Sequence, residues 1–370
     1  MATSDIISRT QGFYTQKPDA GILQIEFGFY SLEAWREQGH ITESTDLNEL
    51  FGYEKLGISS IGNLGWVEAS LYPCFETIVL EDRGDHELVQ DYAGRHVLYF
   101  KNRRSGFMPE YVDHPVKDMK TWEEQVKWRM NPETASRYDG FDEHSMDVRK
   151  AQLEGYHVQQ NCIGGYMYLR SIMGPCELLY HLYDQPELVH DCMQTWFKLA
   201  DTVIARRQQY VNIDELFLAE DICYKTGSLI SPDMMKEFLF PYYQQLIANI
   251  KARNMDKGKR FYLQIDTDGD CRSVIDLYLE LGMDYMSPFE VAANCDVVAI
   301  GKQYPDLLIK GGIDKRILAS GREAIDREVE RILPVMKKRG GYMPCCDHGV
   351  PAEVPFEDYV YYRKRISEYR

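Results

Sequence analysis

The feature that most constrains the fold is a regular alternation of short apolar runs and longer amphipathic segments, which sets in at about residue 155. The short runs have the length of strands, and the segments between them space their apolar residues as helices do. A strand joined to the next by a helix forms a βαβ unit, so this repetition predicts an α/β fold with parallel strands. The expected strands are 163–169, 215–219, 261–265, 283–287, 307–311 and 340–344, and the expected helices include 186–209, 232–254, 271–281 and 321–338.

At least six such units favour a (β/α)8 TIM barrel over an open, doubly wound sheet. The chain has no early GxGxxG turn, which would mark a dinucleotide site in the open sheet. Its 370 residues fit one barrel of typical size that carries an insertion. We therefore predict a single domain over 1–370, with the regular β/α repeats in 155–370.

The first third of the chain has a different pattern. Three short β-type runs, 76–81, 86–91 and 96–101, are separated by turn residues, which predicts an antiparallel meander. The stretch 117–131 places its apolar residues at helical spacing and predicts one amphipathic helix. Together these segments predict an N-terminal antiparallel β insertion, or cap, over about 66–130.

Composition excludes several classes of partner. The formal net charge of -16 would repel a nucleic acid backbone. No segment approaches the ~18 consecutive apolar residues of a membrane span, and residues 1–20 lack the pattern of a secretion signal. The nine cysteines form no CxxC pair, which indicates reduced thiols rather than a disulfide framework. We expect a cytoplasmic protein that binds neither nucleic acid nor a membrane.

Polar residues with catalytic potential follow five consecutive expected strands. In a parallel barrel these carboxyl ends meet at one mouth, where the catalytic groups of such enzymes lie. For any single aspartate an N-cap role is equally open, and it is our prediction for Asp270 and Asp314. So many converging carboxylates need a counter-charge, and a metal ion is the simplest one. The residues concerned are Glu220, Asp221, Asp266, Asp268, Glu290, Cys346 and His348.

The residue types at these strand ends favour zinc. Asp266 and Asp268 are two positions apart, so on a continuing strand both face the same side. Carboxylate together with imidazole is a common zinc set, whereas an all-oxygen set would suit magnesium or calcium. The predicted ligands are drawn from Asp266, Asp268, His348, Glu220, Glu290 and Cys346.

At these motifs the sequence resembles the uroporphyrinogen decarboxylase-like superfamily, and within it the branch of corrinoid-dependent methyltransferases. The resemblance runs from about residue 155 to the end of the chain and is weaker over 66–130, where Met108-Pro109 is one of the matching pieces. This resemblance implies the same barrel fold. Its most specific pieces are Arg170-Ser171-Ile172-Met173-Gly174, Glu220-Asp221-Ile222, Gly311-Gly312-Ile313-Asp314 and Asp347-His348-Gly349-Val350-Pro351.

The thiol methyltransferases of this superfamily hold zinc with one histidine and two cysteines. The resemblance places Asp266 at the histidine position, Asp268 at the first cysteine position and His348 at the second. A thiolate-rich site has thus become one of oxygen and nitrogen. Zinc held by oxygen and nitrogen ligands is a harder Lewis acid than zinc held by thiolates, and it suits an oxygen substrate better than a thiol.

True uroporphyrinogen decarboxylases resemble one another in an arginine-rich N-terminal strand that meets the acidic porphyrinogen. The comparable strand here, 22–29, contains no arginine. A mouth rich in carboxylates would also repel a substrate that carries eight of them. Decarboxylation of uroporphyrinogen is therefore the less favoured activity.

Our leading hypothesis is a zinc-dependent methyltransferase of the O-demethylase type, which moves a methyl group from a methoxylated substrate, an aromatic one among the candidates, to a corrinoid protein. The corrinoid is assigned to a partner because the chain lacks an Asp-x-His-x-x-Gly cobalt-ligating element. Two alternatives remain open, a metal-free decarboxylase of a pyrrolic or other small acid and a non-catalytic binding barrel. The identity of the methyl donor is also left open, as is whether the chain forms a homodimer. The predicted catalytic residues are Asp266, Asp268 and Glu220, and the predicted substrate-binding residues are Asp221, Arg170 and Tyr342.

Overall fold

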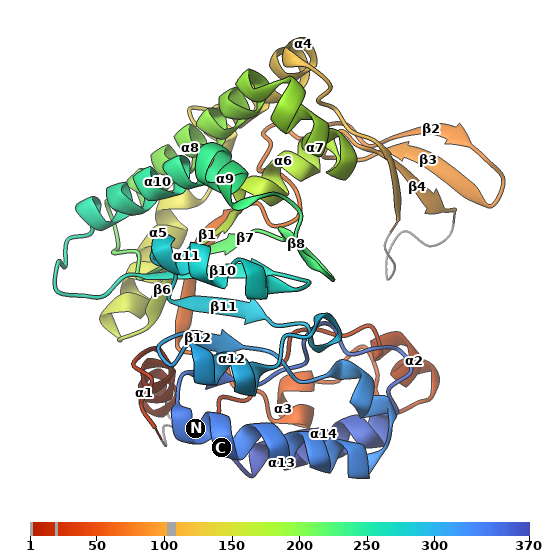
Figure 1. The fold of residues 1–370 in the computed structure, drawn as a ribbon, viewed down its shortest axis with the longest axis vertical. Coiled ribbons are helices and arrows are strands. Elements are labelled where there is room, and N and C mark those ends of the chain that lie inside the picture. Colours follow the sequence, from red (N-terminus) through yellow and green to blue (C-terminus); the bar gives the residue numbers. More distant parts are fainter. Residues whose placement is uncertain (1–2, 19–20, 102–108) are drawn as a thin grey trace.

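A computed structural model describes residues 3–18, 21–101 and 109–370, and its centre is a parallel sheet. The sheet has seven strands in the order β1-β6-β7-β10-β11-β12-β13, and every neighbouring pair is parallel (Figure 1). The predicted α/β class with parallel strands is confirmed. The strands are β1 (Ile58–Leu64), β6 (His157–Ile163), β7 (Glu215–Ala219), β10 (Tyr262–Thr267), β11 (Tyr285–Pro288), β12 (Leu308–Lys310) and β13 (Tyr342–Met343).

Helices connect successive strands, and side chains cap the starts of several of them. The Ser231 side chain accepts the N–H of Met234 ahead of α9 (Pro232–Met234). Asp270 and Asp314 accept the N–H groups of Arg272 and Arg316, so both are N-caps as predicted. The longer helices are α5 (Phe141–Leu153), α6 (Gly165–Met173), α7 (Pro175–Asp184), α8 (Pro186–Arg207), α10 (Phe240–Arg253), α11 (Ile275–Leu281), α12 (Val297–Gln303), α13 (Arg322–Arg339) and α14 (Phe356–Ser367).

The expected strand 163–169 is wrong. The strand ends at Ile163, and residues 165–173 form helix α6, which is buried along nearly its whole length. An apolar run cannot by itself distinguish a buried helix from a buried strand. The true strand, β6, escapes a search for apolar runs because it carries the polar residues Gln159 and Asn161.

Two predicted helices are interrupted by turns of other types. The helix expected over 232–254 consists of α9, a π turn over Met235–Leu239, and α10. Pro241 explains the interruption, because proline lacks an N–H and its ring clashes with the preceding turn of an α-helix. The stretch 117–131 likewise divides into α4 (Met119–Thr121), a π turn and a 3-10 turn.

The sheet curls around an interior of its own. A cluster of buried apolar side chains joins strands β10 to β13 with α1 (Thr3–Tyr14) and the segment after it. Within the described ranges, β1 and β13 are the edges of the sheet and do not pair with each other. The cluster consists of Phe13, Tyr14, Leu23, Ile25, Tyr262, Tyr285, Leu308, Met343 and Cys345.

The segment 22–29, expected as a strand, forms one isolated parallel bridge, between Phe29 and Val350 in the loop after β13. Side chains take up backbone groups that a neighbouring strand would otherwise bind. Arg363 donates to the carbonyl of Ile25 at 3.1 Å, and Glu54 accepts the N–H of Gln24 at 2.8 Å. Side chains from distant parts of the chain thus bind backbone groups that a strand ladder would otherwise bind.

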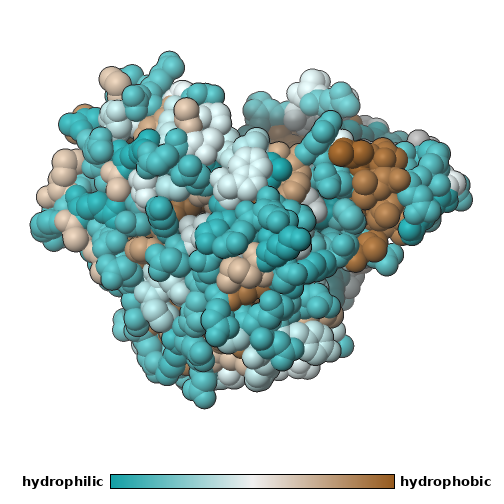
Figure 2. Space-filling model, turned by 90° about the horizontal axis from the view of Figure 1, so that it is seen from above, coloured by the Kyte–Doolittle hydropathy of each residue, from teal (hydrophilic) through white to brown (hydrophobic). Residues whose placement is uncertain are grey.

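The predicted antiparallel meander is present and forms a four-stranded sheet, β2-β3-β4-β5. It extends from the side of the molecule toward which the parallel strands point (Figure 1). Residues 102–108, including Met108, lie outside the described residues. Figure 2 shows a hydrophobic patch on this side, and Ile78, Val79 and Leu80 of β2 are exposed. The strands are β2 (Ile78–Asp82), β3 (His86–Gln90), β4 (His96–Phe100) and β5 (Glu110–Asp113).

Among the described helices, none combines the length and the apolar character that crossing a bilayer requires.

Candidate active site

A cavity of about 310 Å³ lies at the carboxyl ends of the parallel strands. The structure brings six of the predicted site residues to its walls. Acidic side chains form one part of the lining and apolar side chains another. The lining residues are Phe27, Trp66, Val67, Met167, Arg170, Ala219, Glu220, Asp221, Asp266, Asp268 and His348.

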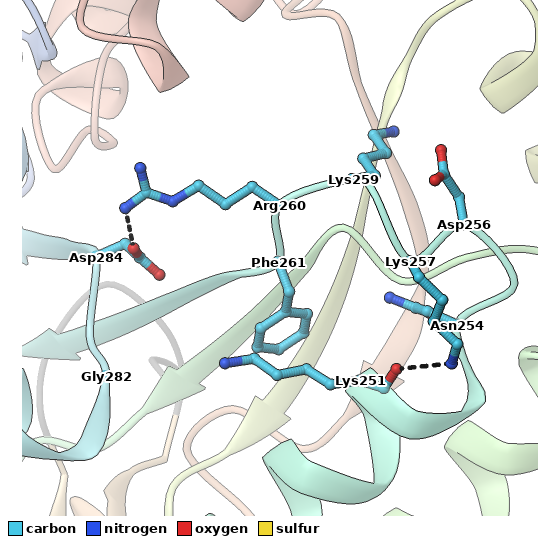
Figure 3. A pocket seen from close by; sticks show the side chains of 9 residues that line it. All are labelled: Lys251, Asn254, Asp256, Lys257, Lys259, Arg260, Phe261, Gly282 and Asp284. Carbon is cyan, nitrogen blue, oxygen red and sulfur yellow. Dashed lines mark hydrogen bonds and ion pairs between the residues drawn. The ribbon is translucent and has the colours of Figure 1, made fainter.

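A larger depression, of about 380 Å³, lies at the opposite ends of the strands and is lined by basic residues (Figure 3). Its cations already have partners, since Arg260 pairs with Asp284 and Lys259 pairs with Asp214. Lys257 donates to the last carbonyls of α10. Because enzymes built on parallel α/β sheets bind their ligands beyond the carboxyl ends of the strands, the smaller, acidic cavity is the better candidate.

Glu220 follows β7 and is completely buried at the cavity wall. The Tyr243 hydroxyl contacts its two carboxyl oxygens at 2.8 and 2.7 Å, and the N–H of Tyr166 donates at 3.2 Å. Tyr243 also accepts the N–H of Gly165, so its own hydrogen points to the carboxyl group. Burial outweighs these donors and raises the pKa of Glu220 to about 7.

Two aspartates, Asp266 and Asp268, lie two positions apart at the end of β10. Asp266 accepts a hydrogen bond from the Ser287 hydroxyl, and burial raises its pKa to about 6. Burial, together with the negative charges of Asp221, Asp266 and Glu290, raises the pKa of Asp268 to about 8. At neutral pH the two carboxyl groups therefore differ in protonation, although they lie on the same strand end.

His348 stands beside Asp268, with 3.6 Å between its Nε2 and the Asp268 Oδ2. Its Nδ1 accepts the N–H of Gly349 at 2.8 Å, which assigns the ring proton of the neutral form to Nε2. Burial lowers the pKa of His348. The ring of Tyr30 stacks on the imidazole at 5.8 Å, and Phe27 lies 5.0 Å away.

Asp221 and Arg170 form an ion pair at the cavity wall, with 2.7 Å between Oδ2 and Nη2. The backbone of Asp221 has a φ of 41°, a left-handed conformation that is rare for a residue other than glycine. It is held there because the N–H groups of Glu220 and Asp221 both donate to the carbonyl of Asp266. The ends of β7 and β10 are thereby tied together beneath the cavity.

Three predicted site residues lie outside the cavity lining. Glu290 accepts the N–H of Gly269 at 2.9 Å and lies 3.5 Å from the Lys315 ammonium. Tyr342 is buried and donates to the carbonyl of Gly311. Cys346 is completely buried, and burial raises the pKa of its thiol. Glu290 and Cys346 lie in the loops after β11 and β13, and Tyr342 lies within β13. Proximity to a strand end does not reveal which of these side chains enters the cavity.

Sequence reasoning missed the apolar part of the lining. Trp66 and Val67 follow β1, which has no regular apolar alternation and was not predicted as a strand. Met167 lies on α6, which was taken for a strand. Phe27 lies in the expected N-terminal strand, and its alternation with Ile25 was the one available signal.

The predicted zinc site stays a prediction. In residues 3–18, 21–101 and 109–370, no three His, Cys, Asp or Glu side chains gather closely enough to hold one ion. Asp268 and the Nε2 of His348 would supply two ligands. A neutral imidazole that binds a metal through Nε2 carries its proton on Nδ1, but this Nδ1 already accepts the N–H of Gly349. The side chains as they lie do not complete a zinc site.

A parallel α/β sheet with acidic side chains at its carboxyl ends is the arrangement of an α/β enzyme. The chain belongs to the uroporphyrinogen decarboxylase (URO-D) family, whose sequence profile matches residues 162–369, more than half of its length.

Curated relatives agree with this family. Uroporphyrinogen decarboxylase of Saccharopolyspora erythraea is 28% identical over 174 residues, which cover 44% of this chain and 46% of that protein. The enzyme of Citrifermentans bemidjiense is 25% identical over 189 residues, 49% of each chain. The chain spans about half the length of these relatives in the matches. A solved methyltransferase from Methanosarcina mazei shares the fold over 98% of both chains, with a TM-score of 0.59 and 12% identity.

Proposed function

We propose that this chain is a methyltransferase that moves a methyl group from a small methoxylated substrate to a corrinoid carried by a partner protein. Membership of the URO-D family and the fold shared with a methyltransferase over 98% of the chain support this proposal. The observation that carries it is the composition of the cavity, whose lining combines carboxyl groups with apolar and partly aromatic side chains.

The cavity suits a small, flat molecule without negative charge. Its volume of about 310 Å³ is at the lower end of the range of small-molecule pockets. Trp66 stacks on Phe217, with 4.8 Å between ring centroids, and offers a flat surface. A polyanionic porphyrinogen would meet the ionised carboxylate of Asp266 at neutral pH, and the one arginine of the lining, Arg170, is already paired with Asp221.

In the proposed reaction the bond between oxygen and the methyl carbon breaks, and the oxygen keeps the electron pair. When bound, the partner's corrinoid supplies the nucleophile that receives the methyl group. The aromatic wall of this chain would orient the donor. The carboxyl group of Asp268, beside the Nε2 proton of His348, is placed to protonate the departing oxygen.

The proposal extends to the fold. We propose that the curled sheet closes as a (β/α)8 barrel, with the segment 22–29 in the place of the remaining strand. The bridge between Phe29 and Val350 supports this closure. So does the interior cluster, in which Leu23 and Ile25 pack with Met343 of β13.

Decarboxylation is the second candidate, favoured by the names of the curated relatives. Asp266 and Asp268 both line the cavity, where they could accept hydrogen bonds from the N–H groups of a pyrrole. The acidic lining restricts this activity to a substrate with few carboxylates.

The test supplies purified protein with 2-methoxyphenol and free cob(I)alamin, and follows catechol together with the absorbance of methylated cobalamin. We expect both products to form together, and only when cob(I)alamin is present. A parallel reaction supplies uroporphyrinogen and measures carbon dioxide. Release of carbon dioxide without methyl transfer, or equal consumption of the methoxylated donor without cobalamin, would overturn the proposal.

A further inference from the structure

A line of polar side chains crosses the interior of the parallel sheet and ends at the candidate site. It begins at Glu215 of β7 and Gln159 of β6, passes Gln264 of β10 and Ser287 of β11, and reaches Asp266. Gln264 and Ser287 are only 2% and 1% exposed, and Glu215 is completely buried. The rest of this interior is mainly apolar, so these polar groups need an explanation.

From Gln159 onward, the hydrogen bonds in this line run in one direction, toward Asp266. The Gln159 amide donates to Glu215 and, at 3.4 Å, to the side-chain oxygen of Gln264. The Gln264 amide nitrogen then donates to the Ser287 hydroxyl oxygen at 2.9 Å. Because that oxygen already accepts a hydrogen bond, the hydroxyl hydrogen of Ser287 is directed to Oδ2 of Asp266. The orientation of each group follows from the one before it.

We infer that Ser287 is a positioning residue of the candidate site, and that Gln264 sets the orientation of its hydroxyl group. Together they would hold Oδ2 of Asp266 and leave Oδ1 as the oxygen that can meet a bound substrate. The inference rests on the proposed function in one respect, namely that Asp266 acts on what the cavity binds. It adds two residues that lie behind the cavity and outside its lining.

A purely structural role for this line is the competing explanation. Buried hydrogen-bonded groups contribute little net stability compared with apolar residues of similar size, because their desolvation offsets the bonds that they form. A polar line that ends on a cavity carboxylate is therefore better explained by what it does to that carboxylate. The two explanations differ in whether removing the Ser287 hydroxyl affects turnover more than stability.

The first experiment compares Ser287→Ala, Ser287→Thr and Gln264→Met in the methyl-transfer assay. We expect Ser287→Ala to lower kcat by about 10- to 100-fold, as loss of a supporting contact usually does, with KM nearly unchanged. Ser287→Thr keeps the hydroxyl group and should recover most of the rate. Gln264→Met should act in the same direction but less strongly. Ser145→Ala is the control, since Ser145 is buried on α5 and its hydroxyl forms no hydrogen bond with the polar line or with any other described residue.

A second readout needs no substrate. In protein labelled with 13C at the aspartate carboxyl carbons, the Asp266 resonance is assigned by its loss in Asp266→Asn and followed through a pH titration. The Ser287 hydrogen bond stabilises the ionised carboxylate and lowers the pKa of Asp266. The midpoint should therefore rise in Ser287→Ala and stay at the wild-type value in Ser287→Thr and Ser145→Ala.

The two readouts separate the inference from the proposed function. A raised midpoint in a protein that transfers no methyl group would support the positioning of Asp266 and count against the methyltransferase proposal. An unchanged midpoint in folded Ser287→Ala would overturn the positioning inference, whatever the activity. A rate loss shared equally by Ser145→Ala would also overturn it, because a general effect of losing a buried hydroxyl would then suffice.

Discussion

At the scale of single residues, the cavity contains carboxyl groups whose environments set different protonation states. Asp266 accepts from Ser287 and has a pKa of about 6, and Glu220, beside Tyr243, has a pKa of about 7. Asp268 has other acids among its nearest charges, and its pKa is about 8. Carboxyl groups whose pKa values lie near neutrality can either donate a proton to a substrate or accept one from it.

The first prediction concerns the pH dependence of stability. The folded-state pKa of Glu220, about 7, exceeds its ordinary value of 4.5, so folding favours the protonated form. Its contribution is fully present below pH 4.5 and is lost as pH rises through 7. Converted to free energy, the difference is about 3 kcal/mol. Glu220→Gln should therefore gain stability over the wild type between pH 5 and 8.5, as measured by urea unfolding.

A matched control uses an exposed acid on α5. Glu143→Gln should follow the wild-type pH dependence throughout. If Glu220→Gln also runs parallel to the wild type, then Glu220 is not held protonated by burial in the folded protein.

The second prediction concerns His348. Replacing it by Ala removes the Nε2 proton beside Asp268 and should abolish turnover. The fold should persist, because His348 lies on a turn at the cavity and its side chain is 26% exposed. If zinc is bound, His348→Ala should lose it and His348→Cys should retain it with weaker catalysis. Metal analysis, turnover and thermal unfolding of each variant check these outcomes.

Cys346→Ser is the companion variant, since Cys346 is completely buried outside the cavity lining. We expect it to keep both metal content and rate. Loss of both in Cys346→Ser, with both retained in His348→Ala, would show that the final loop presents the thiol instead of the imidazole.

At the scale of elements, the site depends on how closely strand ends and helix starts approach one another. Gly164 joins β6 to α6 and lies directly against Glu220, where a Cβ atom would come within 2.0 Å of a carboxyl oxygen. The N–H of Gly164 also donates to the carbonyl of Ala219, the last residue of β7. The absence of a side chain at this junction lets Glu220 occupy its buried position.

The third prediction follows from this junction. Gly164→Ala should destabilise the protein by about 1 to 3 kcal/mol through overpacking, and should lower activity further by displacing Glu220. Gly28→Ala is the control, because nothing lies within 4 Å of its added Cβ. Urea unfolding of both variants measures the effect. Equal stability of the two would mean that the backbone yields at Gly164 without displacing the acid.

At the scale of the whole molecule, the two ends of the curled sheet differ in character. The carboxyl end carries the acidic cavity. The β2–β5 sheet extends from the side toward which the parallel strands point (Figure 1). Near the other end, α1 packs against the interior, with Tyr14 stacked on His157 at 3.9 Å and Phe13 against Tyr285 at 5.2 Å. We therefore assign the packing that stabilises the fold to the end near α1, and the chemistry to the cavity at the carboxyl end.

The fourth prediction tests this division. Phe13→Ala should cost about 3 to 5 kcal/mol of stability, as loss of a buried phenylalanine usually does. At a temperature where the variant stays folded, its KM and kcat should match the wild type. Tyr183→Ala, at a side chain that is 75% exposed, should leave both stability and kinetics unchanged. A large fall in kcat for folded Phe13→Ala would show that the two ends are coupled.

The amino-acid sequence by itself determined the features that depend on local order. Short apolar runs identified β7, β10 and β11, and turn residues between β-type runs identified the meander. Short-range side-chain chemistry identified the caps at Asp270 and Asp314. The sequence also placed acids at the ends of parallel strands, which is why Glu220, Asp266 and Asp268, which line the cavity, could be named as candidate site residues.

Tertiary structure alone decided which of these strand-end side chains enter the cavity. Glu290, Tyr342 and Cys346 resemble the others in sequence, but long-range packing turns them toward Gly269, Gly311 and the core. The apolar wall also joins residues from segments far apart in the chain, such as Phe27 and Met167, which no local pattern can bring together. The direction of a side chain after a strand depends on non-local contacts, and periodicity carries no record of those contacts.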